Sequence, residues 1–248
     1  VAISPTVALY TGSLGGYYAA QGQDEKVTPL VEQLRAQPQS DFVAHWLAGS
    51  LLALGDRAGA IAELQAALQA PGVPQFVAAV IHIAIGHQDV LNGELDVART
   101  EFEGALRLAP DYIDAEIWLG DLAWLEGDAA GAQRHYLKSS EGLAVYAAKY
   151  ANDTAAGFAP AIQARLALAA RKLGDTAGEQ AALAKADEQL AALRQSVPDW
   201  PLVVAVEGTV ELVRGDQTAA TAAFDRAVAC DRTIASTREM VERLVQGK

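Results

Sequence analysis

The four histidines and the single cysteine are the residues of this chain whose types could support acid–base, nucleophilic or metal chemistry. His87 and Asp121 occupy equivalent places in two apolar segments of similar pattern, so we expect their side chains to be neighbours. A carboxylate beside an imidazole raises the pKa of the imidazole and orients it as a base. No serine or cysteine falls close to this pair, however, and the sequence therefore favours a structural or ligand-orienting hydrogen bond over catalysis.

The other histidines and Cys230 are weaker candidates for a catalytic or metal-binding role. His82 and His87 are five residues apart, which is the wrong spacing for two metal ligands on one helix face. His45 and His135 are isolated, and we expect both at half-exposed helix positions. Cys230 has no second cysteine to pair with, and its place late in an apolar segment predicts a buried, inert thiol. With no phosphate loop or nucleophile motif present, we expect no catalytic residue, no metal and no cofactor.

A recurring turn marks the elements that must position these residues. Glycine followed by an acidic residue or glutamine stands between two apolar segments of helical period at Gly22-Gln23, Gly55-Asp56, Gly93-Glu94, Gly127-Asp128, Gly174-Asp175 and Gly215-Asp216. Glycine adopts the left-handed conformation that ends one helix, and the acidic residue favours the start of the next through the helix dipole. The spacing lies near the roughly 34-residue period of helix–turn–helix repeats and loosens in the C-terminal half.

Composition limits the class of protein and of partner. The chain has 248 residues, 51% of them hydrophobic and 20% charged, with a formal net charge of -12. This charge disfavours nucleic acid, which proteins bind through clustered Lys and Arg, and favours apolar or basic partners. No apolar run reaches the roughly 20 residues that span a bilayer, so we do not expect a membrane-embedded protein. The chain begins at Val1 and its only methionine is Met240, which indicates a processed form or a fragment.

The finer pattern resembles the tetratricopeptide repeat (TPR) family. Leu14, Gly15 and Tyr18 match the family's first-helix motif, and three alanine–aromatic pairs match its second-helix motif: Ala98 with Phe102, Ala132 with Tyr136, and Ala220 with Phe224. Pro110 closes a second helix at the family spacing. The resemblance implies an all-α fold, an α-α superhelix (solenoid) of about six helix–turn–helix repeats in a single domain over residues 1–248. The repeats are expected near 8–40, 41–74, 79–112, 113–150, 160–198 and 201–233, with a capping helix at 234–246.

The pattern breaks in two places between repeats. In the fourth repeat we expect a second helix that runs on past Ser140 toward Tyr150, then a turn near residues 152–157, with Pro160 opening the next repeat. Tyr146, Tyr150 and Phe158 then either reach a partner or a second copy of the chain, or pack on the neighbouring repeat. The other break is the loop at 71–74, which is about four residues longer than the period and predicts a bent junction.

Three carboxylates also replace residues that the family pattern expects to be apolar or aromatic. Glu207 and Glu211 stand at apolar positions of the sixth repeat, where buried carboxylates need partners such as Arg214 or Arg226. Asp89 stands where the third repeat should have an aromatic residue.

The resemblance also implies that the first helix of each repeat lines a concave groove. By register, the candidate partner-binding residues are Leu52, Ile83, His87, Leu91, Asp114, Ile117, Asp121, Trp124, Leu168 and Arg171. The set is mostly apolar and suits an amphipathic helix or an extended apolar segment, with Ile83, Ile117 and Trp124 as anchors. The family's Lys, Asn and Arg set for a C-terminal carboxylate is absent. The alternative is that tight coiling or the chain's own ends fill the groove.

These expectations favour a non-enzymatic scaffold that binds an apolar or basic segment of another protein. The alternative is a sensory or regulatory TPR domain of a larger bacterial signalling or transcription-regulating protein, with self-association left open. An enzyme that uses His87 and Asp121 is the third and least favoured hypothesis. The alanine-rich, cysteine-poor acidic composition fits a bacterial cytoplasm or periplasm equally well.

Overall fold

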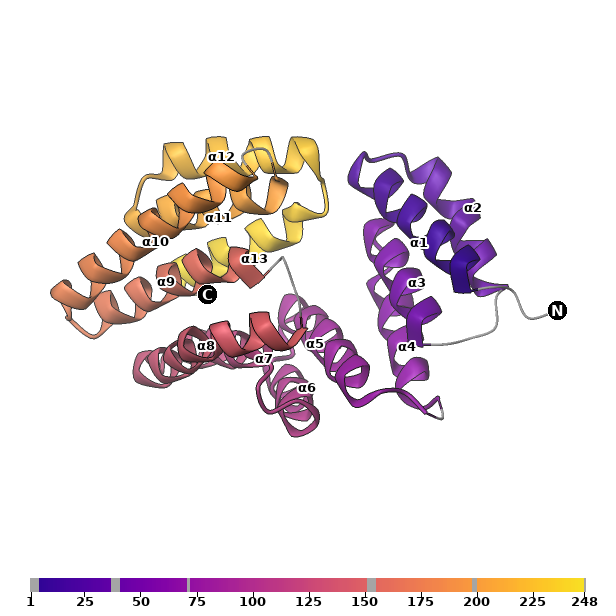
Figure 1. The fold of residues 1–248 in the computed structure, drawn as a ribbon, viewed down its shortest axis with the longest axis horizontal. Helices are drawn as coiled ribbons and strands as arrows, with labels where there is room; N and C mark the ends of the chain where they lie inside the picture. The colour runs from indigo at the N-terminus through magenta and orange to yellow at the C-terminus, as the bar shows by residue number, and fades with distance from the viewer. Residues whose placement is uncertain (1–4, 37–40, 71, 151–154, 198–199, 248) are drawn as a thin grey trace. The chain divides into compact units, whose positions relative to one another are not determined.

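The computed structural model describes residues 5–36, 41–70, 72–150, 155–197 and 200–247. Thirteen α-helices and no strand lie within these ranges (Figure 1). By their contacts the residues divide into two compact units, Val1–Ala109 and Pro110–Lys248, and each unit is described by itself. The helix pairs match the six predicted repeats and the capping helix, which confirms the all-α fold class. The prediction of one continuous domain stays a prediction.

The N-terminal unit contains three helical hairpins. They pair α1 (Pro5–Ala20) with α2 (Asp24–Arg35), α3 (Asp41–Ala53) with α4 (Arg57–Leu68), and α5 (Gln75–Asn92) with α6 (Leu95–Leu108). The first helices α1 and α3 pack side by side. The helix α5 packs on α6 and contacts the preceding hairpin mainly through α4, and the described residues of α3 and α5 hardly touch. The long loop between α4 and α5 thus interrupts the regular stacking, as the predicted bent junction requires.

The C-terminal unit contains three more hairpins and a final helix. The pairs are α7 (Ile113–Leu125) with α8 (Ala129–Tyr150), α9 (Ala155–Lys172) with α10 (Thr176–Ser196), and α11 (Pro201–Arg214) with α12 (Gln217–Cys230), followed by α13 (Ile234–Gln246). In Figure 1, α13 lies beside α11; it also packs on α12 and reaches α7. One boundary was predicted wrongly, because α9 begins at Ala155 and Pro160 lies inside this helix rather than opening it.

The Gly-Asp turns have the predicted geometry. All six turn glycines have positive φ, from 69° at Gly22 to 96° at Gly215, which is the left-handed conformation that glycine adopts without steric cost. Four aspartates cap the following helix by accepting a hydrogen bond from the backbone N–H three residues on, at 2.8–2.9 Å: Asp56, Asp128, Asp175 and Asp216. Gln23 and Glu94 make no such side-chain cap.

A glycine and an aromatic ring bring the two helices of a hairpin together. In the third repeat, a Cβ atom added to Gly86 of α5 would lie 2.5 Å from Cε1 of Phe102 on α6. Phe102 is fully buried, so its ring has no room to move aside. Gly120 with Tyr136, and Gly208 with Phe224, repeat this contact in the C-terminal unit. The alanine–aromatic motif therefore works together with a glycine on the facing helix.

The long helix α8 extends to Tyr150, as predicted. Tyr146 near its end is 2% exposed and stacks on Tyr112, with ring centroids 5.8 Å apart. The half-buried ring of Phe158 on α9 also contacts Tyr146, in an edge-on arrangement with ring centroids 6.4 Å apart. Of the two expectations for these aromatics, Tyr146 and Phe158 thus follow the one in which they pack on the neighbouring repeat. The side chain of Tyr150 lies outside the described residues.

Candidate functional site

The predicted groove residues of the N-terminal unit lie on α3 and on one face of α5. Ile83 and His87 share that face of α5 with Val80, and all three side chains are half-buried. We call these three residues the α5 face. Leu52 of α3 is also half-buried, whereas Leu91 near the end of α5 is buried. The unit therefore presents part-exposed apolar side chains at two of the predicted positions, Leu52 and Ile83.

His87 has a low basicity within the N-terminal unit. Burial, followed by the positive charge of Arg57, lowers the pKa of His87 to about 4. A neighbouring carboxylate would have raised it. The imidazole is therefore neutral at physiological pH, and its low basicity does not suit it to act as a general base at that pH.

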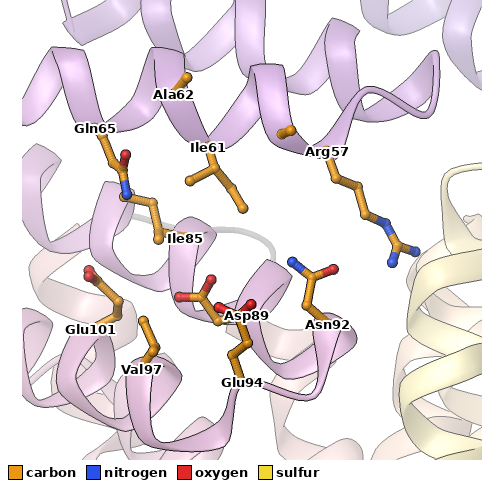
Figure 2. Close-up of a pocket in the computed structure, with 11 residues that line it drawn as sticks. Arg57, Ile61, Ala62, Gln65, Ile85, Asp89, Asn92, Glu94, Val97 and Glu101 are labelled. Carbon is orange, nitrogen blue, oxygen red and sulfur yellow. The ribbon is translucent and has the colours of Figure 1, made fainter.

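A hollow lies on another side of α5, between α4, α5 and α6, as Figure 2 shows. Its volume is about 470 Å³. Three aliphatic side chains, Ile61, Ile85 and Val97, line it together with the polar residues Arg57, Gln65, Asp89, Asn92, Glu94 and Glu101. The lining thus combines an apolar wall from three helices with three carboxylates.

Asp89 is the least usual residue of this hollow. It is only 4% exposed, and its Oδ2 atom accepts no hydrogen bond from any described residue. Burial, followed by the nearby negative charges of Glu101 and Glu94, raises the pKa of Asp89 to about 6. Asp89 also lies in the last turn of α5, where the negative end of the helix dipole opposes an added negative charge. Ionisation of Asp89 in the native state therefore costs free energy of folding.

Other carboxylates at atypical positions of the repeat pattern are compensated by arginines. Arg214 donates to both oxygens of Glu211 at 2.7 Å. Arg194 and Arg226 pair with Glu207 at 2.8 and 3.2 Å. The predicted need for arginine partners is thus confirmed in the sixth repeat, and the contrast makes the environment of Asp89 unusual.

Glu101 connects the hollow to a histidine. Its Oε2 lies 2.6 Å from Nδ1 of His82 on α5. A second hollow of about 540 Å³ adjoins the first and shares the side chains of Gln65, Ile85 and Glu101 with it. The same kind of pair recurs in the C-terminal unit with the helices exchanged, because Glu116 of α7 lies 2.6 Å from Nδ1 of His135 on α8. The prediction that His135 is isolated was therefore wrong.

Asp121 of the C-terminal unit is the centre of a buried polar network. It is 1% exposed, and Arg165 of α9 donates to its two oxygens at 2.8 and 2.9 Å. The hydroxyl of Tyr136 on α8 donates to Oδ1 at 2.8 Å. Burial alone would lower the pKa of Arg165, but the Asp121 carboxylate outweighs burial and holds the pKa above its usual range. This carboxylate ties α7, α8 and α9 together and does not face solvent.

The final helix contacts one of the predicted groove residues of α7, Trp124. The indole Nε1 of Trp124 donates to the backbone oxygen of Leu244 on α13 at 2.6 Å. Ile117 and Leu168, each 7% exposed, belong to the core cluster of this unit, and Trp124 and Val245 pack against that cluster. In the C-terminal unit α13 therefore contacts Trp124, one of the positions where an external segment was expected.

The remaining candidate residues have separate environments. Asp114 is half-buried, and burial raises its pKa to about 6 against an opposing hydrogen bond with Tyr112. Arg171 is exposed and pairs with Glu179 at 2.6 Å. Cys230 was predicted to be buried but is exposed, because it lies in the last position of α12. The partner-binding role of these groove positions stays a prediction.

The described residues contain neither a metal-binding cluster nor a helix suited to span a membrane. Within the ranges that the structure describes, no three His, Cys, Asp or Glu side chains are placed so that they could hold a metal ion. No described helix is both long and apolar enough to cross a bilayer. The hollow with Asp89 and the Asp121 network are the features that sequence reasoning missed, since Asp89 stood out only as a departure from the repeat pattern.

Comparison with known proteins identifies the fold. No protein-family model matches the sequence, and no curated protein matches it. A chain of the Cut9–Hcn1 hetero-tetramer of the APC/C is 16% identical, with a TM-score of 0.56 over 96% of this chain and 42% of that one. TTC0263, a thermophilic TPR protein of Thermus thermophilus, is 21% identical, with a TM-score of 0.50 over 83% of this chain and 99% of that one. BtubC from P. vanneervenii is 18% identical, with a TM-score of 0.50 over 94% and 90%.

These likenesses, at such low identity, concern the fold alone. They show an all-α array of helical hairpins of the tetratricopeptide repeat class. This chain has the tetratricopeptide repeat fold, as the glycine, alanine and aromatic pattern predicted. It spans 42% of the Cut9–Hcn1 chain to which it is similar.

Proposed function

We propose that the protein is a non-enzymatic interaction scaffold that binds an apolar segment of a partner protein on the α5 face. Stacked helical repeats form extended surfaces that serve for binding, and the neighbours in fold include a subunit of a hetero-tetramer. One observation supports the choice of surface. Val80, Ile83 and His87 keep part of their surface exposed, while Ile117 and Trp124 of the C-terminal unit are buried in the core or bonded to α13.

The partner segment is proposed to be an amphipathic helix or an extended apolar stretch. The α5 face offers two aliphatic side chains at helical spacing and one imidazole that is neutral at physiological pH. Such a face gains its binding energy mainly from burial of apolar surface, roughly 25 cal/mol per Å² before the costs of association. Leu52 of α3 is proposed as a further contact.

Selection from a random peptide library tests this proposal. Peptides that bind the wild-type protein should be apolar, and the Ile83→Glu variant should bind them at least about tenfold more weakly, since a charge would be placed in an apolar contact. Leu137→Glu is the matched control, because Leu137 is an exposed leucine on α8 and lies outside the proposed surface. Circular dichroism must show unchanged helicity for both variants. Equal binding by wild type and Ile83→Glu would reject the α5 face.

A regulatory role is the second candidate, and α13 is the observation that favours it. A partner that competes for Trp124 would have to displace the contact between Trp124 and Leu244. Release of α13 would then expose apolar residues of α7 and signal that the partner is bound. Measurement of which helices a bound peptide protects separates this candidate from the first.

A further inference from the structure

The hollow between α4, α5 and α6 contains a buried carboxylate, one oxygen of which accepts no hydrogen bond from the described residues. Asp89 lines the hollow, is more than nine-tenths buried, and has an oxygen that no described residue hydrogen-bonds. Buried charges in proteins are normally paired, because an unpaired charge loses its hydration without replacement. In the sixth repeat even the partly exposed Glu207 and Glu211 have arginine partners.

The charges around Asp89 increase the need for a cation. Glu101 and Glu94 are the neighbouring charges that act on it most, and both are negative. Among the described residues that line the hollow, Arg57 is the cationic one, and in Figure 2 its side chain extends away from these carboxylates. Its positive charge also acts on His87. The hollow therefore has a local excess of negative charge.

The shape and lining of the hollow indicate which kind of cation fits. A volume of about 470 Å³ accommodates a group the size of a long side chain. Ile61, Ile85 and Val97 supply an aliphatic wall, against which the methylene stem of a basic group can pack while its charged end reaches Asp89. The described carboxylates and histidines are not grouped so that they could hold a metal ion. An organic cation fits both the aliphatic wall and the carboxylates of this lining.

We propose that the hollow binds a guanidinium or alkylammonium group on an apolar stem, with Asp89 as its principal counter-charge and Glu94 and Glu101 as supporting charges. This site is separate from the α5 face and does not depend on the function proposed for it. The cation has two sources that share one chemistry, a free amine or guanidine, or a basic side chain of a partner protein.

Titration calorimetry with matched probes tests the site. The probes are n-butylguanidinium, its neutral analogue n-butylurea, a short blocked peptide with one central arginine, and the same peptide with citrulline in place of arginine. We expect at least one cationic probe to bind saturably and its neutral analogue not to bind. Asp89→Asn, which keeps the shape of the side chain, should weaken binding at least about tenfold. Val97→Trp should also weaken it by filling the hollow from an exposed position.

Controls separate this site from a general effect of charge. Glu103→Gln removes one carboxylate from an exposed position of α6 outside the hollow and should leave binding unchanged. Ile83→Glu should also leave it unchanged, so failure of the α5 face and failure of this site are distinguishable. Binding of n-butylguanidinium as tight as that of the arginine peptide would identify a free cation as the source, and tighter binding of the peptide would identify a partner's side chain. Absence of saturable binding by both cationic probes, or full binding by Asp89→Asn, would overturn the proposal.

Discussion

Asp89 shows how one residue changes the environment of a repeat. In the first repeat the equivalent position holds Tyr18, whose ring is half-buried and lies 4.9 Å from Nζ of Lys26. The aspartate of the third repeat is smaller and charged, and it lies at the wall of a hollow rather than filling space. A local departure from the family pattern thus coincides with both a hollow and an uncompensated charge.

The titration of Asp89 predicts a specific dependence of stability on pH. Its native pKa of about 6 lies above the ordinary value of 3.8, so the native state binds more protons than the unfolded state between these values, and stability falls as pH rises from about 4 to 6. Asp89→Asn should therefore raise the free energy of unfolding by about 1–2 kcal/mol at pH 7.5, with solvent screening allowed for, and by much less at pH 4.

Urea denaturation of wild type and Asp89→Asn at both pH values measures this difference. His82, His87, Glu94, Glu101 and Arg57 are the other charged or titratable groups around α5, and they are common to both proteins, so they largely cancel in the comparison. A variant that is less stable than wild type at pH 7.5 would show that the buried carboxylate has a stabilising partner in the folded protein.

Gly86 is a second position where a single residue decides the packing. Gly86→Ala places a methyl group against the buried ring of Phe102 and should lower the free energy of unfolding by about 1–3 kcal/mol. Gly49→Ala is the matched control in the same unit, because its Cβ would meet no atom within 4 Å and alanine favours a helix by about 0.5–1 kcal/mol. Thermal unfolding followed by circular dichroism should show opposite shifts, and parallel shifts would refute the close-contact interpretation.

At the scale of helices, α7, α8 and α9 depend on the network around Asp121. Asp121→Ala leaves the buried guanidinium of Arg165 without its carboxylate and should cost about 3–5 kcal/mol of stability. Tyr136→Phe removes only one hydrogen bond of the same network and should cost about 1–2 kcal/mol. The double variant Asp121→Leu with Arg165→Met should recover much of the loss, since no charge is then left buried. If it is no more stable than Asp121→Ala, the loss does not come from the unpaired charge.

How much the sequence predicts differs between elements. The turn glycines, their aspartate caps and the length of α8 follow from residues close together in the chain, and all were predictable. The contact of Trp124 with Leu244 joins residues 120 positions apart, and the pairing of Arg165 with Asp121 spans 44 positions. The repeat register alone could assign Asp121 and Trp124 to a first helix. It could not show that Asp121 accepts hydrogen bonds from α9 or that Trp124 donates one to α13.

On the scale of the whole molecule, the two units differ in what they leave exposed. In the N-terminal unit the α5 face and the hollow present part-exposed side chains. The repeat register predicted the α5 face but not the hollow. The hollow depends on how α4 and α6 meet α5, which no single repeat specifies. In the C-terminal unit α13 packs on α11 and α12 and covers Trp124 of α7. We therefore propose that the N-terminal unit carries the recognition surface.

Amide hydrogen exchange with and without a library-selected peptide tests this assignment most directly. We predict slower exchange in α5, residues 75–92, when the peptide is bound, with unchanged exchange in α7 and α13. The Ile83→Glu variant, exposed to the same peptide concentration, serves as the control and should show little protection. Protection of α7 together with faster exchange in α13 would contradict the account, because the partner would then displace α13 and occupy the C-terminal unit.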